Sequence, residues 1–429
     1  MQLIDSEVVK EYIDSLLKEI KNKEVHQEIT YEILSHIEES YEHALETGLN
    51  SEESILQAIK SMGSPEEAGQ RLNKIHKGKI EWGIVVPSIL MCLFGIFLML
   101  FMAGYINSFT RGMAVKTVVS SVMGFIMAVI LYIFDYRKIK KYCGKIFVGA
   151  NLILLIQLFF PPINGANKFI TIGPITISTL QVYLFLICVS LPGVLEEVKA
   201  KNNKVLFRLL AIYAIPSLLI FLTPSGMDFI IYTCIFTVLC ISSKFSKKYI
   251  TLIFMIFIGG IIIQFDNFSY MINRITSFIN RDPNGMGYIY DLMDSLIKSS
   301  GFLGNGMDKN IQLLPEVYGH YIFLYIVYTF GWILALALIA LVVLFIIRMF
   351  ATARVVKDSY GKLILMSFGT LFLIQFSFNI LMNLNLVPAM NINCPFLSYG
   401  GTSMLVNISS IGLIMSIYKR KNYSPVIIN

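Results

Sequence analysis

The feature that most constrains this chain is a series of long apolar runs separated by short charged loops. Ten runs approach the roughly 20 residues that a helix needs to cross the hydrocarbon layer of a membrane: 83–105, 114–134, 145–161, 178–194, 206–223, 226–243, 249–265, 319–348, 363–386 and 396–418. Only 15% of the 429 residues are charged, against about a quarter in soluble domains. The runs predict an all-α, polytopic membrane protein of about ten transmembrane helices, with 145–161 and 178–194 short enough to be tilted or partly re-entrant.

The charges of the connecting loops alternate along the chain. Lys and Arg gather before the first apolar run and after the second, fourth, sixth, eighth and tenth, whereas the intervening short loops hold few. Cytoplasmic loops of membrane proteins carry the excess of Lys and Arg. The pattern predicts a multi-pass protein of the bacterial cytoplasmic membrane, with both termini cytoplasmic and one large extracytoplasmic loop at 266–318. The basic residues therefore report topology and do not indicate a nucleic-acid partner.

The amino-terminal part of the chain has a different composition. Residues 1–70 contain 16 acidic and 5 basic residues, a net charge of −11. Apolar side chains recur at helical spacing, as at Ile29 and Ile33. We expect residues 1–78 to form a small cytosolic domain of about four helices, ahead of a transmembrane domain over 83–420. Its acidic surface would repel anionic lipid headgroups, so the expected partner of this domain is a cytosolic protein.

Local signals mark the ends of the last two helices of this domain. Asn50 and Glu53 can cap the start of the third helix, and Gly63 ends it. Ser64 and Glu67 then open the fourth as a capping box, with a proline at its first position. The run that begins there, Gly-Ser-Pro-Glu-Glu-Ala, also resembles the permease-prefix modules of Gram-positive membrane proteins.

The cysteines indicate neither a metal site nor a disulfide framework. They lack the spacing of a metal site, and most lie in apolar runs, so we expect reduced, buried, small apolar side chains. They are Cys92, Cys143, Cys188, Cys234, Cys240 and Cys394. No metal site and no cofactor is predicted from these residues.

A nine-residue segment carries the strongest likeness to a known family. Residues 395–403 read Pro-Phe-Leu-Ser-Tyr-Gly-Gly-Thr-Ser. This resembles the PF(I/L)SYGG(S/T)S signature of the SEDS family (shape, elongation, division and sporulation), which includes RodA, FtsW and SpoVE. Adjacent glycines allow close approach of backbone and headgroup, and the hydroxyls can donate hydrogen bonds where water is scarce. The resemblance implies substrate binding by Ser398, Tyr399, Gly400, Gly401, Thr402 and Ser403; the alternative is a glycine-hinged helix start with an interfacial tyrosine.

Two further segments resemble external loops of that family. Residues 164–170 read Asn-Gly-Ala-Asn-Lys-Phe-Ile and are similar to a family segment with Asn-Gly-Ala, two basic residues and Trp. Lys168, the basic residue kept, can pair with a lipid pyrophosphate or snorkel toward the interface, and both interpretations stay open. Within 266–318, Arg274 and three later glycines match the order and spacing of the family's large loop. Arg274 is therefore a further substrate-binding candidate.

The segment that should carry the chemistry departs from the family. Residues 314–323 read Leu-Pro-Glu-Val-Tyr-Gly-His-Tyr-Ile-Phe and are similar to the family's LPEAHTDFIF. Glu316 is kept, but His320 stands where the family has its essential catalytic aspartate. An imidazole can act as a base near neutral pH, yet it does not bind a divalent cation as a hard carboxylate does. His320 is thus either a substitute base or an interfacial histidine without chemistry, and Glu316 is the best remaining acidic candidate.

Asp228 is a candidate of its own. It lies three residues beyond an acidic position that the family has and this chain lacks, so on a helix it would share that face. Carboxylates within membrane segments are functional candidates by default, which makes Asp228 a candidate intramembrane acid. The alternative is an aspartate at the interfacial end of a helix.

The resemblance spans about residues 140–420 and implies a function. The family polymerises lipid II, which requires a base near the acceptor hydroxyl and positive charge or a divalent cation near the leaving pyrophosphate. It implies an integral membrane protein of peptidoglycan assembly, cell division or cell shape. Such a protein would bind membrane lipid and a polyprenyl-linked glycan precursor like lipid II, in a cleft formed by 164–173, 266–318 and 395–403. A single-span transpeptidase is the protein partner that the resemblance implies.

Three functional classes stay open at this point. The kept scaffold and the lost aspartate leave an active glycosyltransferase with a rearranged site, or a non-catalytic relative that regulates or binds a partner. A flippase or transporter of the lipid-linked precursor is compatible with ten helices and with polar groups such as Asp228 in the apolar part. No clear internal repeat is present in the sequence, which counts against a transporter built from inverted repeats.

Overall fold

The structure is a computed structural model that divides into two compact units. It describes residues 6–23, 26–76, 80–106, 108–161, 169–173, 175–201, 204–223, 225–263, 269–281, 285, 287–306 and 309–422. One unit, here the helical module, comprises Met1–Ile80, Val355–Ser359 and Ile417–Asn429. The other, here the membrane unit, comprises Glu81–Arg354 and Tyr360–Ser416.

The helical module contains four amphipathic helices around a small apolar core. They are α1 (Glu7–Lys18), α2 (His26–Glu46), α3 (Ser51–Met62) and α4 (Pro65–His76). Val9, Leu16 and Ile29 are fully buried in that core. The predicted caps are confirmed: the Asn50 side chain accepts a hydrogen bond from the Glu53 amide at 2.8 Å. Likewise the Ser64 hydroxyl accepts one from the Glu67 amide at 3.4 Å, and Gly63 ends α3 with φ +76°.

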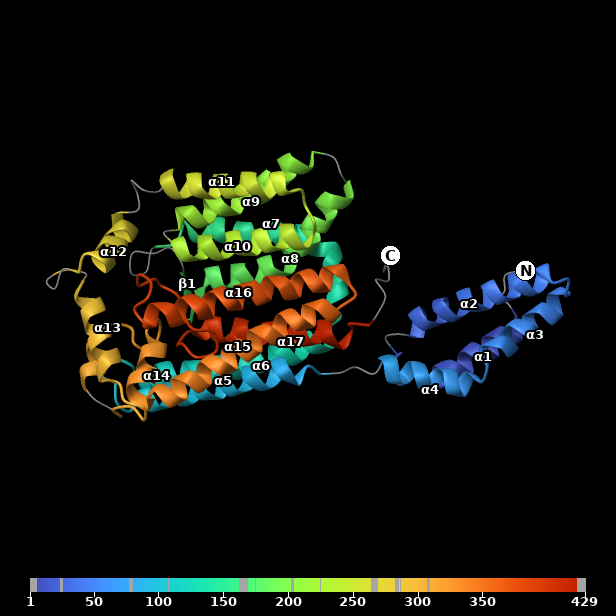
Figure 1. The fold of residues 1–429 in the computed structure, drawn as a ribbon, viewed down its shortest axis with the longest axis horizontal. Helices are drawn as coiled ribbons and strands as arrows, with labels where there is room; N and C mark the ends of the chain where they lie inside the picture. The colour runs from blue at the N-terminus through green and yellow to red at the C-terminus, as the bar shows by residue number, and fades with distance from the viewer. Residues whose placement is uncertain are drawn as a thin grey trace. The chain divides into compact units, whose positions relative to one another are not determined.

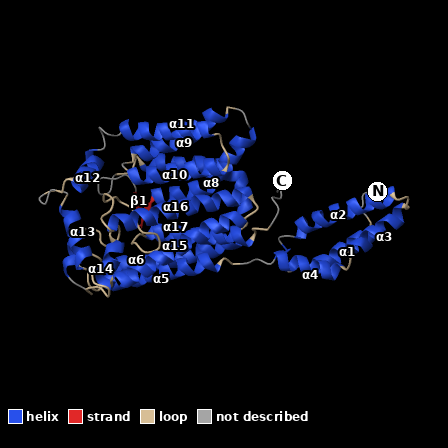
Figure 2. Ribbon diagram, in the orientation of Figure 1, coloured by secondary structure: helices blue, strands red, loops and turns tan. Residues whose placement is uncertain are grey.

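The membrane unit is almost entirely helical, as Figure 2 shows. Its described helices are α5 (Trp82–Met102), α6 (Arg111–Ile133), α7 (Cys143–Gln157), α8 (Thr179–Lys201), α9 (Val205–Leu222), α10 (Gly226–Ser242), α11 (Lys247–Ile263), α12 (Ser269–Ile279), α13 (Tyr288–Ser299), α14 (Ile322–Phe330), α15 (Trp332–Val355), α16 (Ser359–Asn383) and α17 (Gly401–Lys419). Two 3-10 helices, η3 (Tyr136–Tyr142) and η4 (Lys309–Leu313), and an antiparallel pair of strands, β1 (Phe169–Ile172) and β2 (Ile175–Ser178), complete it.

The apolar runs of the sequence correspond to membrane helices. In the described part of the chain, seven helices are long and apolar enough to cross a membrane: α5, α6, α8, α9, α15, α16 and α17. Three more predicted spans correspond to the shorter helices α7, α10 and α11, of 15, 17 and 17 residues. The prediction of an all-α, polytopic membrane protein is therefore confirmed. The described cysteines are all free, and five of the six are buried.

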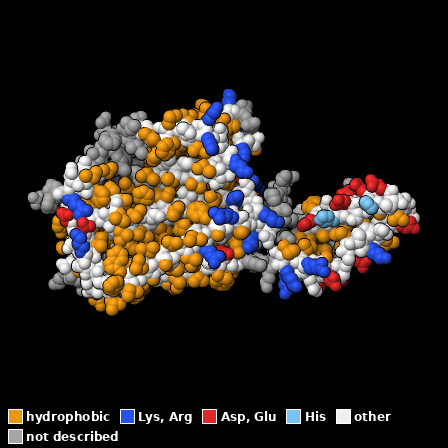
Figure 3. Space-filling view, viewed as in Figure 1, with side chains coloured by type: hydrophobic (Ala, Val, Ile, Leu, Met, Phe, Trp, Pro, Cys, Tyr) orange, Lys and Arg blue, Asp and Glu red, His pale blue; other side chains and the backbone are white. Residues whose placement is uncertain are grey.

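The two ends of the membrane unit differ in charge. Lys and Arg gather in and beside the connections from α6 to α7, α8 to α9 and α10 to α11. Figure 3 shows Lys and Arg side chains along one end of the unit, here called the basic end. The strand pair and helices α12 to α14 lie at the opposite end, here called the loop end (Figure 1). Exposed apolar side chains cover the surface between the two ends (Figure 3).

Two predicted spans were wrong in extent. The run 319–348 is two helices, because Gly331 takes φ +89° between α14 and α15 and breaks the helix. A Cβ on Gly331 would lie 2.2 Å from the carbonyl oxygen of Phe302, so only glycine fits there. The span 178–194 was predicted to be short, but α8 continues through Pro192 to Lys201 and has 23 residues.

The last predicted span, 396–418, also starts differently. Helix α17 begins at Gly401, because Phe396 takes φ +63° and the preceding residues form turns. The Phe396 ring packs against Phe345, Phe372 and Phe376 at 5.5–6.4 Å between centroids. On α5, a Cβ at Gly95 would lie 2.2 Å from the Phe396 carbonyl oxygen, so α5 packs directly on this turn.

Candidate functional site

The signature segment at the start of α17 is hydrogen-bonded to the backbone of Tyr318 and Gly319. The buried Ser398 hydroxyl donates to the Gly319 carbonyl at 2.7 Å and accepts from the Cys394 amide at 2.8 Å. The Tyr399 amide donates to the Tyr318 carbonyl at 2.8 Å. Two segments about 80 residues apart are thereby joined, which places Glu316, His320, Ser398 and Tyr399 in one region of the loop end.

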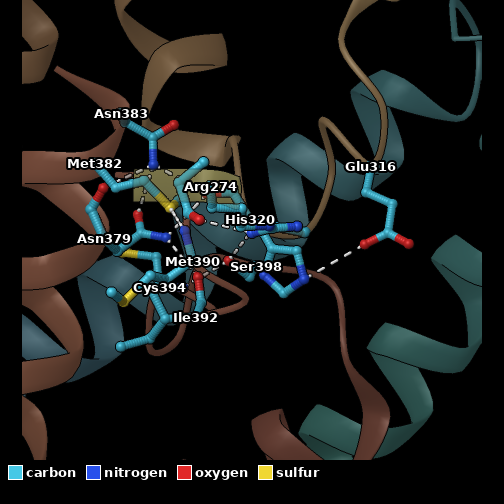
Figure 4. A network of polar contacts seen from close by, with 12 residues as sticks. Arg274, Glu316, His320, Asn379, Met382, Asn383, Met390, Ile392, Cys394 and Ser398 are labelled. Carbon is cyan, nitrogen blue, oxygen red and sulfur yellow. Dashed lines mark hydrogen bonds and ion pairs between the residues drawn. The ribbon is translucent and has the colours of Figure 1, made fainter. Parts of the chain in front are cut away.

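Two buried asparagines of α16 bond the backbone carbonyl of His320. Asn379 and Asn383 both donate from their side-chain amides to the His320 carbonyl, at 3.0 and 2.9 Å (Figure 4). Asn379 also donates to the Ile392 carbonyl at 2.9 Å, and the Asn383 side chain accepts from the Leu324 amide at 3.0 Å. These asparagines therefore fix the entry into α14. The sequence analysis assigned neither asparagine a role.

His320 and Glu316 form an ion-pair contact next to this backbone network. The His320 Nε2 lies 3.4 Å from the Glu316 Oε2, and Figure 4 shows the imidazole directed toward the carboxylate. The Glu316 side chain is 51% exposed and the His320 side chain 22% exposed. A carboxylate beside an imidazole can orient the ring and stabilise its protonated form after proton transfer. The Nε2 faces Glu316 and the Nδ1 of the same ring is buried, so the imidazole would have to turn before either nitrogen could accept a proton from a substrate hydroxyl.

An aromatic cluster lies beside this pair. The rings of Tyr318, Tyr399 and Phe109 are 5.0–5.7 Å apart between centroids. Burial, assisted by the negative charge of Glu316, raises the pKa of Tyr318 above its ordinary value. Burial, assisted by Tyr318, likewise raises the pKa of Tyr399. Both phenols therefore stay protonated at neutral pH, and they combine an apolar ring with a hydrogen-bonding group.

Arg274 binds the loop that precedes the signature segment. Its guanidinium donates to the Ala389 carbonyl at 2.6 Å. Tyr290 joins the two segments, because its hydroxyl donates to the Arg274 carbonyl and accepts from the Ala389 amide, both at 3.2 Å. The contacts described for Arg274 thus position backbone, and they connect α12 and α13 to residues 385–392.

A second link between α13 and this loop is ionic. Asp294 forms an ion pair with Arg281 at 2.5 Å and accepts from the Asn385 side chain at 2.5 Å. Burial opposes ionisation of Asp294, but the hydrogen bonds from Arg281 and Asn385 outweigh it and lower the pKa of Asp294. Asn385 itself takes φ +57° just after α16. The helices of the large loop are therefore fastened to the turn that leads into the site.

The remaining signature residues contact the strand pair and neighbouring helices. The Thr402 hydroxyl accepts from the Ser178 amide of β2 at 3.1 Å. A Cβ on Gly401 would lie 2.8 Å from the Ser120 hydroxyl of α6, and one on Gly400 would lie 3.3 Å from the Ser403 Cβ. Ser403 accepts from the Asn407 amide at 3.5 Å. The segments 169–173, 314–320 and 395–403 thus meet at the loop end.

The two remaining predicted site residues are Lys168 and Asp228. Lys168 lies outside the described residues. Asp228 is in the first turn of α10, where its carboxylate accepts from the Ser225 hydroxyl. Among the described residues, no group of three or more His, Cys, Asp and Glu side chains could hold a metal ion. A divalent cation at the site therefore stays a hypothesis.

The fold and the site define a class: a multi-pass helical membrane protein with a carboxylate–imidazole pair and tyrosines at one end. The model of the FtsW, RodA and SpoVE family, described as cell cycle proteins, matches residues 81–423. Because this is most of the chain, the protein belongs to the SEDS family, as the signature segment predicted.

Individual relatives agree with this assignment. The chain is 25% identical over 298 residues to the probable peptidoglycan glycosyltransferase FtsW of Coxiella burnetii. This alignment covers 66% of this chain and 80% of the relative. It is 24% identical over 287 residues to the protein of the same name from Idiomarina loihiensis, with 64% and 70% covered. Both relatives are therefore named as probable peptidoglycan glycosyltransferases.

Solved structures share the fold. A chain from a study of the structural coordination of polymerization and crosslinking by a peptidoglycan synthase complex has a TM-score of 0.68 at 18% identity, covering 80% of this chain and 99% of that one. The rod shape determining protein RodA of Thermus thermophilus has a TM-score of 0.60 at 16% identity, with 80% and 98% covered.

Proposed function

We propose that this protein binds a polyprenyl-linked glycan precursor of the lipid II type at the loop end of its membrane unit. Its role would be in peptidoglycan assembly during cell division or shape determination. One observation carries the proposal: the signature segment, through Ser398 and Tyr399, is hydrogen-bonded to the carbonyls of Gly319 and Tyr318, next to His320. That contact presents the Glu316–His320 pair and two half-buried tyrosines together.

The chemistry of such a precursor suits these groups. A glycan hydroxyl is a proton donor that an imidazole can accept from, and Glu316 would stabilise the imidazolium that results. Sugar rings have apolar faces and hydroxyl edges, which matches phenol groups that offer both kinds of contact. The leaving pyrophosphate needs positive charge, for which Lys168 or a divalent cation are the candidates, whereas the described contacts of Arg274 are with backbone.

A second candidate function has its own supporting observation. His320 occupies the position where the resemblance implies an essential aspartate, and an imidazole cannot replace a hard anionic ligand for a divalent cation. If the family reaction depends on such a cation, this chain would bind the precursor without polymerising it. It would then act as a regulator or as a partner for an active enzyme.

Both functions can be tested with full-length protein in lipid nanodiscs. Saturable binding of fluorescent lipid II, weakened by His320→Ala and Glu316→Gln but not by His36→Ala on the helical module, would support the binding site. The exposed His36 is a suitable control because it removes an imidazole elsewhere. Absence of saturable binding by the wild-type protein would exclude the proposal.

A polymerisation assay then separates catalysis from regulation. Glycan strands made from lipid II by the wild type and lost in His320→Ala would indicate that His320 is a base. No strands from the wild type, together with strands from His320→Asp, would indicate a scaffold that lacks only the carboxylate. A single-span transpeptidase should be included in parallel, because the solved relative was studied as part of a complex that coordinates polymerization and crosslinking.

The orientation of the chain is part of the proposal. The basic end carries the Lys- and Arg-rich connections, which favours a cytoplasmic location for it and for both termini. The loop end would then face the extracytoplasmic side, where polymerisation occurs. Reporter fusions to each terminus test this: green fluorescent protein should be fluorescent and alkaline phosphatase inactive. Residues 1–78 would then be available to a cytosolic protein partner.

A further inference from the structure

The loop between α13 and η4 is paired with the break between α14 and α15. Four backbone hydrogen bonds join the two segments: Asn305 N to Tyr328 O at 2.9 Å, Gly306 N to Thr329 O at 3.1 Å, Trp332 N to Gly301 O at 3.3 Å and Ile333 N to Phe302 O at 3.3 Å. We call residues 301–306 the glycine loop. Its backbone is therefore bonded on both sides of the helix break.

Glycines make this pairing as close as two backbones permit. Gly304 takes φ +79°, and a Cβ there would lie 2.4 Å from the Thr329 carbonyl oxygen. A Cβ on Gly331 would lie 2.4 Å from the Gly304 amide nitrogen. A side chain at either position would separate the segments, so the position of the glycine loop on the break is fixed by the sequence.

The depth of the loop follows from helix geometry. Glu81 and Arg348 form an ion pair at 3.8 Å near the basic ends of α5 and α15. Trp332 is 16 residues from Arg348 along α15, which is about 24 Å at about 1.5 Å per residue. The hydrocarbon layer is about 30 Å thick, and charged side chains lie at its boundary. The helix break and the glycine loop therefore lie within the layer, on its loop side.

Ring contacts between α5 and the break give the same depth. The Phe330 ring lies 6.2 Å from the ring of Phe97 and 5.5 Å from that of Phe101. Phe97 is 16 residues beyond Glu81 on α5, again about 24 Å. Two helices measured from the same ion pair thus agree on the level of the break.

Two side chains of the glycine loop, those of Phe302 and Leu303, are apolar and uncovered, and the side chain of the exposed Asn305 donates a hydrogen bond to the Ser299 carbonyl at 3.0 Å. Phe302 is 76% exposed and Leu303 is 81% exposed. Ile333 and Leu336 on the adjoining face of α15 are 58% and 57% exposed, so the loop continues an apolar surface of a membrane-spanning helix. Irregular backbone at membrane depth requires its polar groups to be satisfied by protein, and the four hydrogen bonds to the break supply such partners.

We propose that the glycine loop is a re-entrant segment that inserts Phe302 and Leu303 into the acyl chains of the leaflet on the loop side. The ligand of this surface is lipid hydrocarbon, and the inference rests on the membrane fold and not on the proposed glycan binding. The loop follows α13 directly, and α13 is fastened to residues 385–389 through Tyr290 and Asp294. Lipid contact would therefore hold α13 against the turn that leads into the site.

Tryptophan fluorescence in reconstituted full-length protein tests the insertion. The chain has two tryptophans, Trp82 and Trp332, which would be replaced by phenylalanine. Phe302→Trp then reports from the glycine loop, with Leu303→Trp as a second reporter in case the first fails to fold. Leu313→Trp is the matched control: Leu313 is apolar and 57% exposed, and the neighbouring Gln312 bonds the Tyr105 carbonyl beyond the end of α5.

Each reporter would be measured in phosphatidylcholine bilayers with and without bromine on the acyl chains, and with iodide in the buffer. We expect the reporters at 302 and 303 to lose fluorescence in brominated bilayers and to resist iodide, and the reporter at 313 to show the reverse order. Quenching of the loop reporters by iodide, or equal behaviour at 302 and 313, would overturn the proposal. Loop reporters that resist both quenchers would also overturn it, because protein, such as a second copy of the chain, would then cover the loop.

Discussion

Replacing Ser398 with alanine tests whether the signature segment is held by buried hydrogen bonds. The Ser398 hydroxyl donates to the Gly319 carbonyl and accepts from the Cys394 amide, and all three residues are buried. Its removal leaves two buried backbone groups without these partners. A buried polar group left unsatisfied costs about 1–3 kcal/mol, so Ser398→Ala should lower the free energy of unfolding by about 2–6 kcal/mol.

Ser409→Ala is the matched control for this measurement. Ser409 is equally buried, and its hydroxyl donates at 2.7 Å to the Leu405 carbonyl one turn earlier in α17. Such a bond only supplements the helix hydrogen bond of that carbonyl, so its loss should change stability by about zero. Unfolding of both variants would be followed by circular dichroism in mixed micelles titrated with sodium dodecyl sulfate. Equal stability of the two variants would refute the reasoning, because the Ser398 contacts would then contribute nothing beyond an ordinary helical serine.

Three further predictions concern the rest of the loop end. Gly331→Ala should destabilise the protein by at least about 2 kcal/mol, because the new Cβ would lie 2.2 Å from a carbonyl oxygen. Gly306→Ala, with φ +66° but open space around it, should cost about 1–2 kcal/mol in the same dodecyl sulfate unfolding assay. The lowered pKa of Asp294 stabilises the folded loop above the ordinary aspartate pKa of about 3.9, and this contribution is lost as the pH falls through the lowered folded pKa. The protection factors of the α13 amides, corrected for the intrinsic pH dependence of hydrogen exchange, should therefore fall in acid in the wild type, whereas in Asp294→Asn they should be low at every pH. Thr402→Val should speed amide exchange at Ser178, since it removes the acceptor of that amide, and unchanged exchange would contradict the assigned contact.

Much of the fold could be predicted from apolar periodicity, since helices that face lipid must be continuous apolar runs. The run 319–348 shows where this fails. Hydropathy passes through Phe330 and Gly331 without interruption, yet the chain breaks there because a glycine with φ +89° accommodates a neighbouring backbone. Apolar composition records what faces lipid, whereas the break depends on a contact with residue 302, which is distant in sequence.

Elements of the large loop and the strand pair were not predicted for a related reason. Helices α12 and α13 are short and amphipathic, and they lie inside 266–318, which was predicted only as one large extracytoplasmic loop. The strand pair was not predicted, although the alternating β-branched residues around Gly173 are a typical hairpin signal. Such short elements are stabilised by tertiary contacts, as with the Thr402 hydroxyl on β2.

The residues of the candidate site were predicted better than the hydrogen bonds that join them. The sequence singled out Glu316, His320 and the signature hydroxyls, and the structure places these residues in one region. The sequence could not show that the Ser398 hydroxyl forms hydrogen bonds with the protein backbone, because a sequence does not reveal which groups lie next to a hydroxyl in the fold. The roles of Asn379 and Asn383 were missed for the same reason, since their amides bond the carbonyl of a residue about 60 positions earlier.

Because the Ser398 hydroxyl bonds the protein backbone, the signature segment has a structural role of its own, and its presence does not by itself indicate enzymatic activity. The signature segment, which first indicated the family, is hydrogen-bonded within the protein, whereas His320 stands where the resemblance implies a catalytic aspartate. A member of the family could therefore lose its enzymatic activity and still keep the sequence motifs by which genome surveys would classify it. Surveys of such chains would be more informative if they scored residue 320 separately from the residues that close the fold around it.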